Sequence, residues 1–236
     1  MTARLYLFAE GQTEQIFAST VVSARLAARG VFLRPPILIA HARKKRIVHR
    51  GGGRHYAPMK NDIMRFLRQD QNPDAFFTTM IDLYALHSDF PGRDQAERLR
   101  SSPLKRVEFL EEAFAHDIGD QRFIPYLQLH EFEACLFSDP EKFRKFYPKG
   151  DKPIAALKQI VGQHETPELI DDGQHTAPSK RITAEFPDYE DAKTVVGPQV
   201  AEAIGLDLIR QKCPHFNSWI SRLESLGKPR DQRPSE

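Results

Sequence analysis

Three acidic residues stand at positions where α/β proteins commonly carry their chemistry. Glu10 follows the apolar run Leu5–Ala9, and Asp82 and Glu133 lie at or just after the ends of two later apolar runs. Open α/β folds bind ligands at the carboxyl ends of their parallel strands, where such side chains meet at one sheet edge. We therefore expect these three carboxylates to lie close together.

Carboxylates held this close repel one another unless a cation lies between them. Oxygen-only ligation suits Mg²⁺ or Mn²⁺, and such an ion can neutralise a phosphate and activate water for in-line attack. Asp89, in a loop closed by Pro91-Gly92, adds a further candidate ligand. The sequence thus predicts a metal site formed by Glu10, Asp82, Asp89 and Glu133, with phosphate chemistry.

Each acid also has a simpler interpretation. Glu10 and Glu14 suit the N-terminal end of a helix, where the dipole favours negative charge. Asp89 is compatible with an ordinary turn. Glu131 and Glu133 are two residues apart and cannot share one helix face, so at most one points at the site from a regular helix. We favour Glu133.

Two further residues complete the candidate catalytic set. His130 precedes the two glutamates, and we leave open whether it supports the ligands, transfers a proton or only begins a helix. Lys180, within Ser179-Lys180-Arg181, could stabilise a charged transition state beside a phosphate. The same stretch is compatible with a helix start at Pro178-Ser179 whose charges are solvated.

A long basic stretch points to a polyanionic ligand. The net charge is only +2, yet no acidic residue occurs between Glu14 and Asp62, while ten Lys or Arg do. Such local charge favours nucleic acid, although a solvated loop is the alternative. The residues expected to grip the backbone are Arg43, Lys44, Lys45, Arg46, Arg50 and Arg54.

A glycine run lies inside this basic stretch. Gly51–Gly53 could present backbone N–H groups to phosphate or form a flexible turn. It lacks the Gly-Lys-Ser/Thr ending of a nucleotide P-loop, so we do not interpret it as one.

Strand-like and helix-like patterns alternate over the first 130 residues. We expect strands at 3–9, 37–41, 75–83 and 123–129, and helices at 14–29 (capped by Thr13), 58–70 and 94–117. This alternation predicts an α/β fold with a mostly parallel sheet flanked by helices.

Later residues show only helical patterns, with Phe216 and Trp219 packing the last helix on the core. The expected division is an α/β domain at 1–138, a helical C-terminal lobe packed on it at 139–227, and a flexible tail at 228–236.

Composition argues against a membrane or exported protein. No apolar run approaches the roughly 20 residues that a membrane helix needs, and the first apolar run is too short for a signal peptide. Cys135 and Cys213 have no metal-ligand spacing and favour reduced, buried thiols. We expect a cytoplasmic protein without a membrane partner.

Several short stretches, taken together, are similar to a known family. They are AEGQTE (9–14), GGGRHY (51–56), MIDLYAL and DFPG (80–92), LHEFEACLFSD (129–139), APSKRI (177–182) and IRQKCPHFNSWISRLE (209–224). With them, the chain resembles the bacterial and archaeal domain-of-unknown-function family 4276, whose members look Toprim-like. The resemblance covers nearly the whole chain.

The resemblance implies a Toprim-like (Rossmann-like) fold with a metal-dependent phosphotransfer site. The family glutamate after the first strand corresponds to Glu10, and the acidic strand-end motif to Asp82. The usual second aspartate of that motif is replaced by Tyr84, a departure that disfavours two-metal chemistry. The resemblance also implies an ABC- or AAA-type ATPase partner and a role in phage defence, both by analogy.

These observations favour a Mg²⁺-dependent (or Mn²⁺-dependent) nuclease acting on DNA or RNA. The alternative is a non-catalytic sensor or effector subunit that binds an ATPase partner and has a degenerate metal site, which Tyr84 favours. A third reading is an enzyme acting on a nucleotide or another small phosphate.

Overall fold

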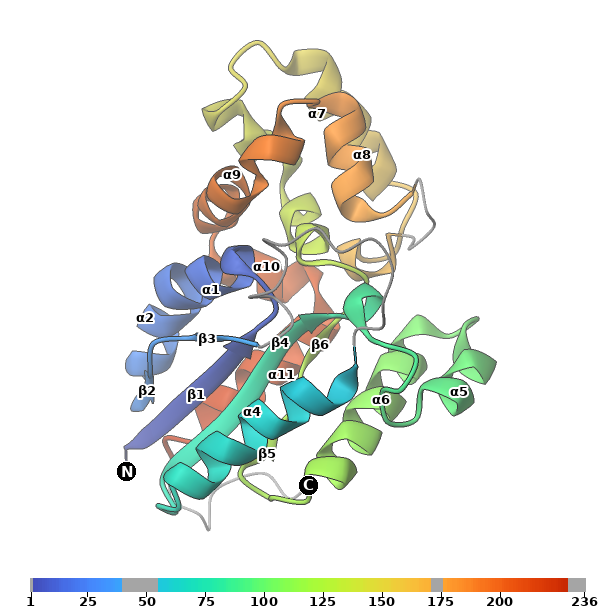
Figure 1. Ribbon diagram of the computed structural model, residues 1–236. Coiled ribbons are helices and arrows are strands. Elements are labelled where there is room, and N and C mark those ends of the chain that lie inside the picture. Colours follow the sequence, from blue (N-terminus) through green and yellow to red (C-terminus); the bar gives the residue numbers. More distant parts are fainter. Residues whose placement is uncertain (1, 40–54, 171–175, 229–236) are drawn as a thin grey trace.

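A parallel β-sheet forms the centre of the computed structural model, which describes residues 2–39, 55–170 and 176–228 (Figure 1). The sheet runs in the order β2-β1-β4-β5, with β3 also paired to β1 and β6 to β4, and every pairing is parallel. Its strands are β1 (Ala3–Ala9), β2 (Val31–Leu33), β3 (Ile37–Leu38), β4 (Ala75–Asp82), β5 (Phe123–Ile124) and β6 (Leu127–Gln128). The expected α/β class with a parallel sheet is confirmed.

Helices cover both faces of this sheet because the central strands are apolar on both sides. On β1, Leu5 and Leu7 join one core cluster, whereas Phe8 joins the other. The first cluster contains residues of α1 (Gln12–Phe17), α2 (Ser23–Ala27), α10 (Leu206–Lys212) and α11 (Pro214–Ser225). The second contains residues of α4 (Tyr56–Gln69), α5 (Arg93–Ala96) and α6 (Pro103–Ile118).

Proline explains where the strands depart from the expected ranges. The strand expected at 123–129 divides into β5 and β6 at Pro125, which has no N–H for the ladder. The strand expected at 37–41 is only the two residues of β3 among those described, and β2, which precedes Pro35-Pro36, was not expected.

The first helix starts earlier than expected and contains an irregular turn. Its N-cap is Gly11, whose N–H donates to Glu14 Oε2 at 2.8 Å, so the expectation of Thr13 as the cap is wrong. A π-helical turn, η1 (Ala18–Val22), separates α1 from α2. The hydroxyls of Ser19 and Thr20 donate to backbone carbonyls four residues earlier, an interaction that disturbs regular helix geometry.

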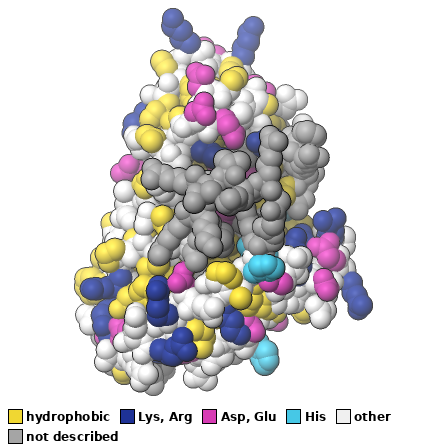
Figure 2. Space-filling view, in the orientation of Figure 1, with side chains coloured by type: hydrophobic (Ala, Val, Ile, Leu, Met, Phe, Trp, Pro, Cys, Tyr) yellow, Lys and Arg dark blue, Asp and Glu magenta, His cyan; other side chains and the backbone are white. Residues whose placement is uncertain are grey.

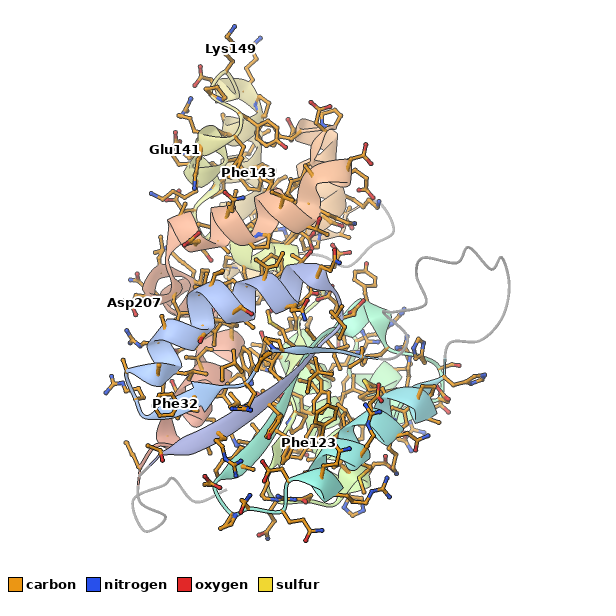
Figure 3. All side chains as sticks on the ribbon, turned by 60° about the vertical axis from the view of Figure 1, so that its left-hand side comes forward. Phe32, Phe123, Glu141, Phe143, Lys149 and Asp207 are labelled. Atoms are coloured by element: carbon orange, nitrogen blue, oxygen red, sulfur yellow. The ribbon has the colours of Figure 1, made fainter. Side chains whose placement is uncertain are left out.

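Beyond the last strand the described chain is helical. Its elements, besides α10 and α11, are η5 (Phe132–Ser138), η6 (Pro140–Lys145), α7 (Asp151–Val161), η7 (Pro167–Leu169), α8 (Pro178–Glu185) and α9 (Tyr189–Ile204). Two short 3₁₀ helices, η3 (Leu83–Ala85) and η4 (Glu97–Leu99), lie earlier, between β4 and α6. Phe143 stacks on Phe186 inside the helical region, while Glu141 and Lys149 lie at its outer end (Figure 3). Phe143 and Leu5 belong to the same core cluster, so the helical region and the sheet share a core.

The last helix is fixed to the sheet through one tryptophan. Trp219 stacks on Tyr126 with 4.2 Å between ring centroids, and its Nε1 donates to Thr78 Oγ1 at 2.9 Å. Trp219 and Phe216 are buried, which confirms that they pack this helix on the core. No described helix combines the length and the apolar composition needed to cross a bilayer.

Substituting Trp219→Phe should keep the aromatic stack and remove the buried hydrogen bond. We expect the free energy of unfolding to fall by about 1–3 kcal/mol, because Thr78 Oγ1 then loses a buried donor. Urea denaturation of Trp219→Phe, Thr78→Val and the double variant measures the coupling between them. Strictly additive losses would show that this bond does not stabilise the fold.

Candidate functional site

Glu10 and Asp82 meet at the carboxyl edge of the two central strands. The Glu10 N–H donates to the carbonyl of Met80 at 3.0 Å, which extends the pairing of β1 with β4 by one residue. Glu10 Oε2 then accepts the N–H of Asp82 at 2.9 Å. The strand register therefore fixes both acids on one rim of the sheet.

The turn that follows β6 brings a third segment to this rim. His130 has a φ of 63°, the one positive φ of a non-glycine residue in the described part of the chain. This left-handed turn redirects the backbone so that the N–H of Phe132 donates to Asp82 Oδ1 at 3.0 Å. His130 is itself buried, and its carbonyl accepts the N–H of Tyr84 at 3.5 Å.

Of the two glutamates after His130, Glu133 is buried beside the other acids. Its Oε1 accepts the hydroxyl of the fully buried Tyr189 in α9 at 3.4 Å. Glu131 instead accepts the N–H of Ser179 with Oε2 at 2.9 Å and so ties this turn to α8. The two residues thus have different neighbours, as their spacing predicts.

Glu14 joins the same group from the first turn of α1. It is 6% exposed, and its charge acts on Asp82, as the charges of Glu10 and Glu133 do. We call Glu10, Glu14, Asp82 and Glu133 the carboxylate cluster.

Burial and nearby negative charge raise the pKa of three members of this cluster, Glu14, Asp82 and Glu133. Burial, followed by the charge of Glu10, raises the pKa of Glu14 to about 8. Burial, followed by the charge of Glu131, raises the pKa of Glu133 to about 7. The pKa of Asp82 lies well above its usual value because of burial and then the charges of Glu10, Glu14 and Glu133. Such shifts are typical of functional sites, although structural clusters also show them.

The cluster has the donor chemistry of a divalent-cation site without a preformed coordination geometry. In the described ranges, no group of three or more His, Cys, Asp or Glu side chains is already arranged to hold a metal ion. The donors are nevertheless all carboxylates, which Mg²⁺ and Mn²⁺ prefer. The N–H of Gly11 donates to one oxygen of Glu14, and the N–H of Phe132 donates to one oxygen of Asp82.

Two other predicted site residues lie among different partners. Both oxygens of Asp89 accept the N–H of Tyr56, at 3.0 and 3.1 Å, so Asp89 caps α4. Lys180 is half-exposed, with Nζ 3.6 Å from Glu190. No contact in the described part of the chain joins either residue to the cluster, and their proposed roles stay predictions.

The predicted nucleic-acid-binding residues, from Arg43 to Arg54, lie outside the described residues. The last described residue before them is Ile39, whose N–H donates to the carbonyl of Ala9 at 3.1 Å, directly before Glu10. On the face shown in Figure 2, the described Lys and Arg side chains are interspersed with acids.

The sequence did not assign three residues to this site: Glu14, which belongs to the cluster, and Tyr189 and Lys193, which act on Glu133. The four-residue spacing of Glu10 and Glu14 was a usable signal, but helix capping explained Glu14 equally well. No local signal marked Tyr189, or Lys193, whose charge lowers the pKa of Glu133. Packing around Tyr189 is tight, since a Cβ added at Gly197 would lie 3.0 Å from its hydroxyl.

The raised pKa values predict that Asp82→Asn stabilises the metal-free protein at pH 8. A carboxyl group whose pKa is raised by folding destabilises the fold as pH rises through its unfolded and then its folded pKa. Asparagine keeps an acceptor for Phe132 and removes the charge. We expect a gain of about 1–3 kcal/mol in the free energy of unfolding with EDTA.

Urea denaturation measures this gain, with Asp89→Asn as a control that removes the same charge. Asp89 carries a lowered pKa despite partial burial, because of its bonds to Tyr56, and should not stabilise when replaced. Mg²⁺ should then raise the stability of the wild-type chain more than that of Asp82→Asn. A metal-free Asp82→Asn variant less stable than wild type at pH 8 would contradict the electrostatic description.

Comparison with known protein families identifies the family of this chain. No curated protein and no solved structure matches the chain significantly. A family model described as "Domain of unknown function (DUF4276)" matches residues 9–224, a range that includes all four members of the carboxylate cluster. The chain therefore belongs to the DUF4276 family.

Proposed function

We propose that this protein is a Mg²⁺-dependent nuclease of Toprim type that hydrolyses phosphodiester bonds. The observation that carries the proposal is the carboxylate cluster at the carboxyl edge of β1 and β4. Buried acids with raised pKa values are costly to ionise, and a divalent cation is the partner that offsets the cost. The basic stretch of the sequence supports a polyanionic substrate.

In this proposal Glu10, Asp82 and Glu133 would hold the ion, and Glu14 is an additional acidic group beside them. When bound, the cation supplies neutralisation of the phosphate charge and a more acidic water. The Asp82 N–H and the Phe132 N–H fix one oxygen of Glu10 and one of Asp82, which orients both carboxylates. The hydroxyl of Tyr189 does the same for Glu133.

Proton transfer in the proposed hydrolysis requires a group that can gain or lose a proton near neutral pH. Glu14 is a candidate for this role, because burial and then the charge of Glu10 raise its pKa to about 8. His130 and Lys180 remain candidates for proton transfer and transition-state stabilisation, respectively. The residues from Arg43 to Arg54 would bind the substrate backbone.

A non-catalytic subunit is the second candidate. One observation favours it: Tyr84 replaces the expected second acid. Under this alternative the cluster is a remnant of a metal site, and the protein acts by binding an ATPase partner. In both readings, the ABC- or AAA-type partner, the phage-defence role and a cytoplasmic location rest on the family resemblance and composition.

The nuclease proposal predicts cleavage of DNA or RNA that requires Mg²⁺ or Mn²⁺. Glu10→Gln and Asp82→Asn should each lower the rate by about 100-fold or more, because each removes a charge that holds the ion. Gel assays with labelled single-stranded DNA, double-stranded DNA and RNA measure the rates. A bis-nitrophenyl phosphate assay tests small phosphate esters.

Glu165→Gln is the matched control, because it removes an exposed charge outside the cluster. Cleavage that survives both cluster substitutions would rule out the site. Absence of cleavage together with absence of Mg²⁺ binding by calorimetry would favour the non-catalytic subunit.

A further inference from the structure

A recess lies along the β5 edge of the sheet, and Phe76, Ile124 and Pro125 are among its lining residues. It has a volume of about 820 Å³ and runs between α6 and α11. Residues of α11 and α6 belong to the core clusters on opposite faces of the sheet, so the two helices lie on either side of its edge and form the two walls of the recess. We call this recess the edge groove; the cluster residues do not line it.

Each wall of the edge groove is one regular helical stripe. Glu108, Glu111 and Glu112 line it from α6, at positions three and four apart. Ser218, Ser221 and Arg222 line it from α11 at the same spacing. The groove is open because the facing side chains on α11 are largely serines, and its walls carry three carboxylates against one guanidinium.

Two of these carboxylates form no ion pair with a described residue, although the charge of Glu108 helps to raise the pKa of His215 after burial, which lowers it, and Glu111. Glu111 accepts the N–H of Leu127 at 2.8 Å and lies 3.2 Å from His215 Nε2, so it links α6 to β6 and to α11. Glu108 and Glu112 are exposed, and neither forms an ion pair with any described residue. Their charges are available to a ligand.

The edge strand itself is closed to strand addition. Pro125 has no N–H, the N–H of Leu127 is taken by Glu111, and the carbonyl of Ile124 accepts the hydroxyl of Thr78 at 2.6 Å. An occupant must therefore be recognised by side chains and not by backbone pairing.

We propose that the edge groove binds a short polypeptide segment of a partner protein that carries Lys or Arg. The α6 stripe from Glu108 to Ala115 spans about 10 Å, which fits roughly three or four extended residues. Cations of the segment pair with Glu108 and Glu112, and the small serine side chains of α11 leave room for its backbone. This function is separate from the carboxylate cluster and does not depend on the nuclease proposal.

Fluorescence anisotropy with two labelled seven-residue peptides tests the proposal. One peptide alternates alanine with lysine and arginine, and the other carries glutamate in place of each cation. The full-length chain should bind only the basic peptide. Glu108→Gln/Glu112→Gln should weaken binding by roughly threefold to tenfold, as expected for the loss of two exposed ion pairs. Ser221→Trp, at an exposed position, should weaken it by filling the groove.

The control Glu165→Gln/Glu202→Gln makes the same change in net charge at exposed positions outside the groove lining. Equal weakening by this control would overturn the proposal, since it would show unspecific attraction. The chain's own residues 229–236 include Arg230 and Arg233. Tighter peptide binding by Arg230→Ser/Arg233→Ser would identify this tail as the occupant and would equally overturn the proposal of a partner segment.

Discussion

The hydrogen bond from the Asp82 N–H to Glu10 Oε2 is the interaction on which the candidate site depends. It forms because β1 and β4 are parallel neighbours whose ends coincide. Two acids are thereby held in one poorly solvated place, and Glu14 and Glu133 add further negative charge. The fold accepts this arrangement at a cost in stability, and a function that needs a cation is a physical reason to keep it.

The helical region contributes more to this site than its distance in sequence suggests. Glu131 holds the start of α8, and α9 supplies the hydroxyl of Tyr189 and the charge of Lys193 to Glu133. The turn at His130 lies between these contacts and Asp82. A displacement of α8 or α9 would therefore change the hydrogen bonds of Glu131 or Glu133. These bonds connect the helical region to the carboxylate cluster.

Apolar runs and the acids that end them were sufficient to predict the parallel sheet and the convergence of Glu10, Asp82 and Glu133. Strand ends are local features, and parallel pairing brings them to one edge. Asp89 shows the limit of this reasoning, because its partner, the N–H of Tyr56, is 33 residues away in sequence. Tyr189 is a second example, because nothing in the sequence around it indicates that its hydroxyl donates to Glu133. Glu14 was ambiguous in principle: it both caps the helix and joins the cluster.

A crystal structure of the protein soaked in Mn²⁺, with anomalous diffraction measured at the manganese edge, tests the central claim most directly. The proposal predicts one strong peak within about 2.0–2.2 Å of oxygens of Glu10 and Asp82, lost in Asp82→Asn. Well-ordered carboxylates with no peak among them at millimolar Mn²⁺ would contradict the proposal that this cluster is a metal site.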